Sequence, residues 1–461
     1  MSDHSDVLVL GGGPGGYAAA LYGAAAGRSV TLVEEDRVGG TCLQRGCIPA
    51  KELLQTAEVL RTVRGAKAFG VGVDAPTIDL GVSVARKQQV VDRLTKGLEQ
   101  LLAGRSVTIV PGRGEIVDAA AHTVRVGDTT LSGDALILAT GSSPRALPGL
   151  SFDGVRVLSS DHVLDRTTVP ESAIIIGGGA IGCEFASFLA DVGSRVTILE
   201  AMPGILPGVD QEAAAIVGRL FKRRKVAVHT GVTVSEGRVT DTGVDVTYSD
   251  GTDTTTISAE VVIVSVGRTP RSAGIGLEGS GVGVDARGYV EVDGRLRTAV
   301  PGVYALGDLV ATPALAHVAF AEAIVAIKDI CGEEPEPIDH SRVPWGIYCH
   351  PEVAFCGPTE EAARAAGHDV VTSVHRFAGN SRAQIMGEAD GLVKIVATTD
   401  GAILGVHIVG PWATELLAPG YLAVNWEATV DDLANLIQPH PTLGELFGES
   451  VLALTGRALH G

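Results

Sequence analysis

The chain has 461 residues, of which 45% are hydrophobic and 20% are charged, a composition typical of a globular protein with several domains. Its formal net charge of -18, with no basic cluster, argues against a role in binding nucleic acid. The N-terminal residues lack the features of a signal peptide, and no apolar run reaches the roughly 20 residues that a membrane span needs. We therefore expect a cytoplasmic protein without a membrane partner.

The first predicted unit consists of a strand, a glycine-rich turn, a helix and a second strand. The strand at residues 7–10 leads into Gly11, Gly13 and Gly16, and the second strand ends at Glu34. In a dinucleotide-binding unit the three glycines permit a tight turn, backbone approach to a pyrophosphate, and close packing of the helix on the strand. The acid accepts hydrogen bonds from a ribose. The segment therefore predicts a dinucleotide site.

A close pair of cysteines, Cys42 and Cys47, follows this unit. Positions five apart in a regular helix have Cα atoms about 8.7 Å apart, whereas a disulfide needs about 4.4 to 6.8 Å. A bond between the two therefore requires a break in the helix, which Gly46 can provide. The alternatives are two buried thiols or half of a metal site. We expect no metal, because zinc patterns need a second close motif. The remaining cysteines form none: Cys183, Cys331, Cys349 and Cys356.

A second unit repeats the pattern of the first. A strand at residues 173–176 is followed by Gly177, Gly179 and Gly182, a helix, and a strand that ends at Glu200. The spacing from the first glycine to the acid is the same in both units. A lone glycine motif is weak evidence, but two copies in the same context predict two dinucleotide sites.

The acids indicate which nucleotides bind. Glu34 and Glu200 can each accept hydrogen bonds from a ribose diol and would repel a 2'-phosphate. Arg195 comes before the strand that ends at Glu200 and not after it, so no obvious basic residue would receive such a phosphate. NAD is therefore favoured over NADP. A relay between two nucleotides and thiols needs a two-electron carrier, which flavin supplies. We assign FAD to the first unit, near Cys42 and Cys47, and NAD to the second.

The remainder of the chain predicts further buried strands and a change of architecture. Three apolar runs that read as buried strands occupy residues 136–141, 261–267 and 303–308, and residues 142–149 look like a linker. After about residue 340 the strands at 392–397 and 403–409 are joined across Asp400-Gly401, a hairpin signal. The predicted fold class is α/β, with two Rossmann-like domains and a C-terminal α+β domain that contains an antiparallel sheet.

Two motifs carry a resemblance that covers essentially the whole chain. GGTCLQRGCIPAK at residues 39–51 and GGGAIGCE at 177–184 resemble the redox and NAD motifs of the flavoprotein disulfide reductase family. Three others are similar to those of the dihydrolipoamide dehydrogenases within it: LAH at 315–317, GNSRA at 379–383 and HPTLGE at 440–445. The resemblance implies that the protein oxidises protein-bound dihydrolipoamide on lipoyl domains of 2-oxo acid dehydrogenase or glycine cleavage complexes, with reduction of NAD.

The resemblance also implies four domains. They are an FAD domain at 1–149, an NAD domain at 150–270, a central domain at 271–340 that completes the FAD site, and an interface domain at 341–461. The last is expected to form an obligate homodimer.

The resemblance assigns roles to individual residues. Cys42 is the thiol that meets the substrate and Cys47 the thiol beside the flavin, while Lys51 lies near the flavin and pairs with Glu184. Asp308 is expected to bind the ribityl chain of FAD. Further FAD contacts are implied for Thr41, Thr140, Gly141, Ala316 and His317, and a further NAD contact for Gly267.

His440 is the expected general base. A neutral imidazole can take the proton of a substrate thiol, whose ordinary pKa of about 8.5 leaves it mostly unreactive at neutral pH. Glu445 is expected to hold the tautomer and stabilise the imidazolium, and His440 is expected to act from the partner subunit. The His440-Pro441 bond is predicted to be cis, because a sharp turn would help to aim the imidazole.

Some residues depart from the family pattern. Gln44 and Arg45 stand where Asn and Val are common, and Arg45 is expected to favour the thiolate form of a neighbouring cysteine. The alternatives are another NAD(P)H-dependent flavoprotein disulfide reductase and a non-catalytic dinucleotide-sensing protein on this fold. Mercuric reductases add a C-terminal cysteine pair that is absent here, and reductases that prefer NADPH fit poorly with Glu200.

Overall fold

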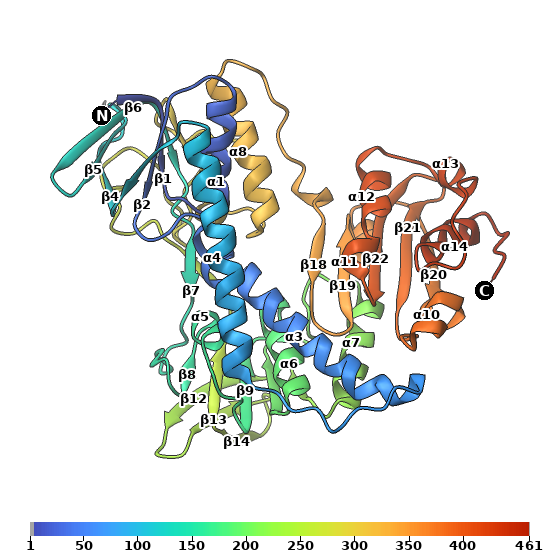
Figure 1. The fold of residues 1–461 in the computed structure, drawn as a ribbon. Coiled ribbons are helices and arrows are strands. Elements are labelled where there is room, and N and C mark those ends of the chain that lie inside the picture. The colour runs from blue at the N-terminus through green and yellow to red at the C-terminus, as the bar shows by residue number, and fades with distance from the viewer. Residues whose placement is uncertain (1–3, 461) are drawn as a thin grey trace.

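The structure is a computed structural model that describes residues 4–460. Figure 1 shows an N-terminal part at the upper left, a middle part below it, and a C-terminal part on the right. Two of the sheets are largely parallel, and the C-terminal sheet is antiparallel throughout, so the predicted fold class is confirmed. None of the helices within 4–460 combines the length and apolar character needed to cross a bilayer.

The first sheet has the order β3-β2-β1-β6-β5-β4, with β17 paired to the other end of β6. Its strands are β1 (His4–Leu10), β2 (Val30–Glu34), β3 (Thr108–Pro111), β4 (Gly114–Asp118), β5 (Thr123–Val126), β6 (Thr129–Leu138) and β17 (Val303–Ala305). Strands β1, β2, β3, β17 and the end of β6 run parallel. The segment after residue 270 thus returns to the N-terminal sheet.

Five helices within residues 4–460 belong to this part of the molecule. They are α1 (Pro14–Ala25), α2 (Gly40–Arg45), α3 (Cys47–Gly65), α4 (Leu80–Gly104) and α8 (Ala316–Ile330), with a 3-10 turn η1 (Ala66–Phe69). Two of them, α2 and α3, carry the redox motif. Helices α1 and α8 lie side by side (Figure 1). Small side chains make this approach possible, because Ala19 and Ala20 of α1 and Ala323 of α8 are completely buried in one apolar cluster.

The second parallel sheet has the order β11-β10-β9-β15-β8. Its strands are β8 (Val157–Leu158), β9 (Ser172–Ile176), β10 (Arg195–Glu200), β11 (Ala227–Thr230) and β15 (Val261–Val264). The accompanying helices are α5 (Ser160–Leu164), α6 (Ala180–Val192) and α7 (Gln211–Arg223). A small antiparallel sheet contains β12 (Thr233–Val239), β13 (Val244–Ser249) and β14 (Thr254–Ala259).

The segment at 142–149, which the sequence predicts to be a linker, contains a short strand. In it β7 (Ser142–Pro144) pairs antiparallel with β16 (Arg268–Pro270). These are the two places where the chain passes between the first two sheets. Because β7 and β16 lie side by side, their backbone N–H and C=O groups bond to each other. A single extended segment would have no such partner.

The C-terminal sheet has the order β18-β19-β22-β21-β20. Its strands are β18 (Trp345–Ile347), β19 (Glu352–Cys356), β20 (Val370–Arg376), β21 (Leu392–Thr398) and β22 (Ile403–Gly410). The helices of this part are α9 (Glu360–Ala365), α10 (Ser381–Met386), α11 (Ala413–Leu416), α12 (Ala418–Asn425), α13 (Val430–Ala434) and α14 (Glu445–Leu454), with the 3-10 turns η3 (His340–Arg342) and η4 (Phe377–Gly379). A further 3-10 turn, η2 (Gly307–Leu309), follows β17 of the first sheet and contacts α8. The predicted hairpin across Asp400-Gly401 is confirmed.

Candidate active site

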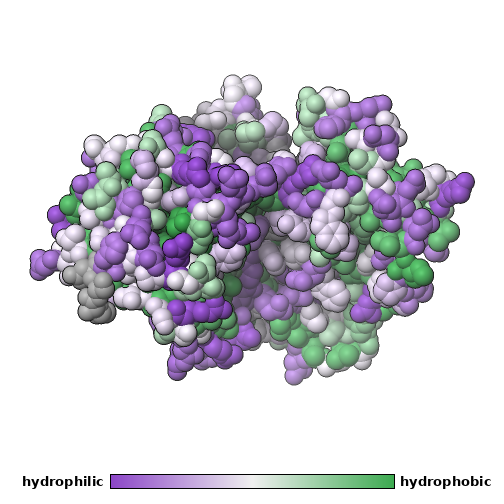
Figure 2. Space-filling model, turned by 90° about the horizontal axis from the view of Figure 1, so that it is seen from above, coloured by the Kyte–Doolittle hydropathy of each residue, from purple (hydrophilic) through white to green (hydrophobic). Residues whose placement is uncertain are grey.

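A single cavity of about 1570 Å³ joins the two glycine turns and the cysteine pair. Figure 2 shows, from above, that the surface is hollowed between the N-terminal part on the left and the C-terminal part on the right. The predicted residues that line the cavity are Gly11, Gly13, Glu34, Thr41, Cys42, Cys47, Lys51, Thr140, Gly141, Gly177, Gly179, Glu184, Glu200, Gly267, Asp308 and Ala316. Five predicted residues are not part of its wall: Gly16, Gly182, His317, His440 and Glu445.

The first glycine turn leaves room only for backbone. Gly11 has a φ of 104°, and a Cβ there would lie 2.4 Å from the carbonyl oxygen of Ala139. A Cβ on Gly16 would lie 1.7 Å from the carbonyl oxygen of Gly11. The N-cap of α1, Gly13, offers no side chain to the first helical N–H groups, so these remain available to a pyrophosphate. The turn fits a dinucleotide.

Glu34 and Glu200 hold their turns in the same way. The backbone N–H of Gly12 donates to Oε2 of Glu34 at 2.6 Å, and that of Gly178 donates to Oε2 of Glu200 at 2.5 Å. The second oxygen of Glu200 accepts from the N–H of Met202 at 2.7 Å. Helix α6 likewise begins after an uncapped glycine, Gly179. The two units that repeat in the sequence therefore also share the same hydrogen bond between the glycine turn and the acid.

Cys42 and Cys47 form a disulfide with a Cα–Cα distance of 4.6 Å. Helix α2 ends at Arg45 and α3 starts at Cys47, with Gly46 between them at φ -140° and ψ -111°. A Cβ on Gly46 would lie 2.8 Å from the carbonyl oxygen of Thr41. The predicted break in the helix is confirmed, and it brings the two cysteines within bonding range.

The other buried thiols are poor nucleophiles. Burial raises the pKa of the Cys183 and Cys349 thiols, and it raises the pKa of Cys356 to about 11. The Cys183 thiol donates to the carbonyl oxygen of Gly178 at 3.2 Å. Because a thiolate is the reactive form, these cysteines remain inert thiols. Among residues 4–460, Cys42–Cys47 is the only disulfide.

Lys51 connects the redox helix to the second nucleotide unit. Its Nζ lies 2.9 Å from Oε1 and 3.0 Å from Oε2 of Glu184, whose side chain is 9% exposed. The same Oε1 accepts the backbone N–H of Tyr348 at 2.9 Å, and Nζ lies 4.8 Å from the centre of the Tyr348 ring. The pair from the sequence prediction thus has a third member, Tyr348, which no local motif indicates.

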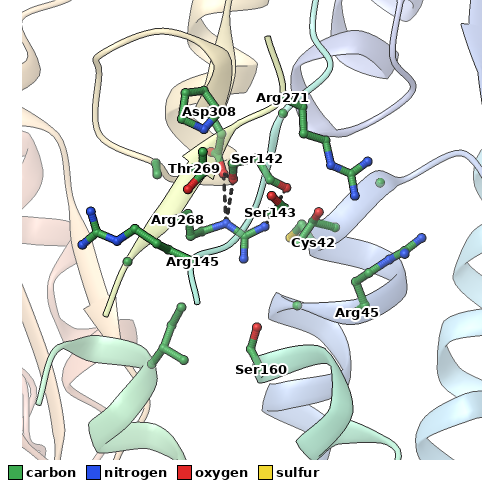
Figure 3. Close-up of a pocket in the computed structure, with 18 of the residues that line it drawn as sticks. Cys42, Arg45, Ser142, Ser143, Arg145, Ser160, Arg268, Thr269, Arg271 and Asp308 are labelled. Atoms are coloured by element: carbon green, nitrogen blue, oxygen red, sulfur yellow. Dashed lines mark hydrogen bonds and ion pairs between the residues drawn. The ribbon is translucent and has the colours of Figure 1, made fainter. Parts of the chain in front are cut away.

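A polar network surrounds Asp308. The Ser142 hydroxyl donates to Oδ2 of Asp308, and Nε of Arg268 donates to the Ser142 hydroxyl oxygen at 2.6 Å and lies 3.5 Å from Oδ2 (Figure 3). The guanidinium also donates to the carbonyl oxygen of Ser142 at 2.9 Å. Arg268 lies in the segment VGRTP at residues 266–270, but the sequence does not show that its side chain reaches from β16 to the turn at Asp308.

Arg145 is a further cavity residue that the sequence does not reveal. Its guanidinium donates to the carbonyl oxygen of Val266 and lies over Gly267, where a Cβ would meet it at 3.3 Å. Figure 3 shows Arg145, Arg268 and Arg271 extending from neighbouring segments at this end of the cavity. Arg271 pairs with Glu35 at 3.0 Å. The positive side chains suit a cavity that takes nucleotide phosphates.

The unusual residues of the redox loop are held by neighbours. The Gln44 side-chain amide donates to the carbonyl oxygen of Val38 and to the Thr95 hydroxyl, each at 2.8 Å. Arg45 lines the cavity and pairs with Asp36. That carboxylate neutralises part of the positive charge which the sequence places beside the cysteines.

His440 and Glu445 form a pair away from the cavity. Nδ1 of His440 lies 2.7 Å from Oε1 of Glu445, and Oε2 accepts the backbone N–H of Thr442 at 2.8 Å. The His440 side chain is 67% exposed. The predicted cis bond between His440 and Pro441 is confirmed. One chain therefore does not bring His440 to the disulfide. His317 is the second residue of α8 and contacts the carbonyl oxygen of Pro344 through Nε2 at 2.7 Å.

Comparisons with family models and with known proteins indicate one family. Residues 5–323 match the family model of pyridine nucleotide-disulphide oxidoreductases, and residues 343–451 match that family's dimerisation domain. Dihydrolipoyl dehydrogenase from Bacillus subtilis (strain 168) is 40% identical over 475 residues, with 100% of both chains covered. Dihydrolipoyl dehydrogenase from Geobacillus stearothermophilus is 40% identical over 461 residues, which cover 99% of this chain and 97% of that one.

Solved structures agree. LpdA from Mycobacterium tuberculosis has a TM-score of 0.91 at 29% identity, covering 97% of this chain and 99% of that chain. The HOCl-induced flavoprotein disulfide reductase RclA from Escherichia coli has a TM-score of 0.86 at 26% identity, with the same coverage. By sequence, fold and disulfide, the chain belongs to the pyridine nucleotide-disulphide oxidoreductase family.

Proposed function

We propose that the protein is a dihydrolipoyl dehydrogenase, which oxidises dihydrolipoamide to lipoamide and reduces NAD+ to NADH. The observation that carries the proposal is the Cys42–Cys47 disulfide in the wall of a cavity shared by two dinucleotide turns. The full-length similarity to two dihydrolipoyl dehydrogenases, each at 40% identity, supports this choice of substrate within the family.

The residues of the first turn fit FAD, and those of the second fit NAD. Gly11, Gly13 and Glu34 would hold the adenosine and pyrophosphate of FAD, and Asp308 its ribityl chain. Gly177, Gly179 and Glu200 would hold NAD. The FAD contacts would be completed by Thr41, Thr140, Gly141 and Ala316, with His317 supporting the start of α8. Gly16 and Gly182 would support the two glycine turns, and Gly267 would lie on the NAD side. Bound FAD supplies a two-electron acceptor that reoxidises the thiol pair and passes the electrons to NAD+.

The protein's own thiols perform the exchange with substrate. One substrate thiol gives its proton to Nε2 of His440, and the resulting thiolate attacks Sγ of Cys42. The Cys42–Cys47 bond breaks and Cys47 leaves as a thiolate. The second substrate thiol then attacks the substrate sulfur of the mixed disulfide, the bond to Cys42 breaks, and the proton of this second thiol passes to the leaving Cys42 sulfur. Two electrons pass from dihydrolipoamide to the cysteine pair, and lipoamide leaves as the cyclic disulfide.

His440 acts from the second subunit of a homodimer in this proposal. The match of residues 343–451 to a dimerisation domain supports it, as do the exposed apolar side chains on the C-terminal part of the chain. These include Trp412, Tyr421, Leu422, Trp426, Leu436 and Ile437, of which Ile437 is 96% exposed. Such surface is costly to leave in water. The charge of Glu445 stabilises the imidazolium once His440 has taken the proton.

The domain boundaries at 149, 270 and 340 stay part of the proposal, as does the partner. Residues 271–340 contribute β17 to the first sheet and Asp308 to its cavity, which supports a central segment that completes the FAD site. Dihydrolipoamide carried on lipoyl domains of 2-oxo acid dehydrogenase or glycine cleavage complexes is the proposed physiological substrate.

Substrate discrimination tests the proposal against its alternatives. The purified flavoprotein is assayed for NADH formation from dihydrolipoamide and, separately, for NADPH-driven reduction of glutathione disulfide. We expect the first reaction to dominate. Dominance of the second would identify another disulfide reductase, and FAD and NAD binding without turnover in either assay would identify a dinucleotide-sensing protein.

A further inference from the structure

A completely buried carboxylate lies behind the turn that carries Asp308. Glu322 of α8 is 0% exposed, and its Oε2 accepts the backbone N–H of Gly307 at 2.6 Å. Gly307 opens the 3-10 turn η2, and the next residue is Asp308, which lines the cavity. Glu322 therefore holds the residue that directly precedes Asp308.

The other oxygen of this carboxylate faces a histidine. Oε1 of Glu322 lies 3.5 Å from Nε2 of His340, which belongs to η3. This separation exceeds that of an ordinary N–H···O hydrogen bond and lies within ion-pair distance. The His340 side chain is 33% exposed and lines a second cavity of about 490 Å³, together with Glu291 and Asp293. The His340 side chain is thus partly exposed, whereas its Nε2 and the Glu322 carboxylate that it faces are buried.

The balance of forces on Glu322 makes a cationic partner important. Burial raises the pKa of its carboxyl, whereas the Thr312 hydroxyl, the Gly307 N–H and His340 oppose the rise. Without a cation nearby, the pKa of this buried carboxyl would rise further, which favours its neutral form. A neutral carboxyl accepts a weaker hydrogen bond than a carboxylate, so the hold on Gly307 would loosen.

We propose that His340 is a positioning residue for FAD, which keeps Glu322 charged so that Glu322 holds the Gly307 N–H and fixes Asp308 toward the cofactor. The inference rests on the proposed FAD site. It makes His340, which does not line the first cavity, a determinant of FAD affinity. It also predicts that the effect of His340 depends on the charge at position 322.

A double-mutant cycle tests this dependence. The variants are H340L, H340Q, E322Q and the double variant H340L/E322Q, and the quantity measured is the FAD dissociation constant of the apo-protein, followed by flavin fluorescence. A glutamine at 322 still offers an oxygen to Gly307 but needs no cation. We expect H340L and H340Q each to weaken FAD binding about tenfold, and H340L to have little further effect in the E322Q background.

E291Q is the matched control, because Glu291 lines the same second cavity as His340 but makes no ion pair with Glu322. It should bind FAD as the unsubstituted protein does. Equal weakening by H340L in both backgrounds would mean that His340 acts through packing alone and would overturn the proposal, as would unchanged binding in H340Q. Failure of the proposed FAD site is distinguishable, since the unsubstituted protein would then bind no FAD, and failure of the proposed enzyme activity would show in the turnover assays and not in these affinities.

Discussion

Glu445 accepts a hydrogen bond from Nδ1 of His440 at 2.7 Å, which leaves Nε2 as the free basic nitrogen. Replacing His440 with Gln removes this base. We expect H440Q to keep FAD and to lose dihydrolipoamide turnover by roughly 10²- to 10⁴-fold, the range typical of general-base catalysis. NADH oxidation by an artificial one-electron acceptor serves as the control, because it needs only the nucleotides. Normal dihydrolipoamide turnover in H440Q would contradict the assignment.

Mixed dimers test whether His440 serves the partner's disulfide. Dimers of one C42S subunit and one H440Q subunit contain one site with both groups intact if the histidine acts across the interface. We therefore expect about half of the unsubstituted turnover per mixed dimer, although both parent homodimers are inactive. Inactive mixed dimers would show that each histidine serves its own chain.

The roles of the two cysteines predict different spectra. In C42S the remaining thiolate of Cys47 is expected beside oxidised flavin, and a long-wavelength charge-transfer absorbance should appear without any reductant. C47S is the matched control and should show no such band. A band in C47S alone would mean that the two roles are exchanged.

Glu200 predicts a preference for NAD over NADP. Its carboxylate accepts the N–H groups of Gly178 and Met202, which fixes its charge where a 2'-phosphate would lie. Ala201 lines the cavity beside it. We expect E200S combined with A201R to narrow the ratio of catalytic efficiencies by about tenfold or more, and E200Q to narrow it less. The prediction is wrong if the unsubstituted protein uses both nucleotides equally well.

His350 predicts loss of stability in acid. Burial, followed by the charges of Arg61, Arg224 and Arg223, lowers the pKa of His350 to about 3, and Glu388 at 4.0 Å does not offset them. In the unfolded chain the pKa is near 6.5, so the unfolded state binds more protons between the two values. The contribution of His350 is therefore complete above pH 6.5 and is lost as pH falls toward 3.

Thermal unfolding of the holoprotein across this pH range measures the effect. On acidification, the midpoint temperature of the unsubstituted protein should fall more than that of H350Q. H368Q, which replaces an exposed histidine, is the control and should follow the unsubstituted protein. A gap that does not depend on pH would contradict this account of His350.

The sequence predicts those parts of the site that depend on local chemistry. The glycine turns need residues without a Cβ, as Gly11 and Gly16 show, and such a requirement leaves a local signature. The same holds for Gly46, where the spacing of two cysteines and the geometry of a disulfide together demand a break in a helix. The hairpin at Asp400-Gly401 is another short-range signal.

The contacts that the sequence does not predict join distant segments. Ser142 and Arg268 meet at Asp308, and Tyr348 joins Lys51 and Glu184, although no periodicity links these positions. An apolar run such as β17 indicates burial but not which sheet it enters, so its return to the N-terminal sheet cannot be read from its residues. His440 lies away from the disulfide of its own chain for a different reason, because in the proposed site it belongs to the second subunit.

The most direct test of the central claim is the steady-state rate of NADH formation from free dihydrolipoamide and NAD+, measured on the purified flavoprotein and on C42S. The account predicts sustained turnover by the unsubstituted protein and its loss in C42S, with FAD still bound to both. No turnover by the unsubstituted protein, or normal turnover by C42S, would contradict it.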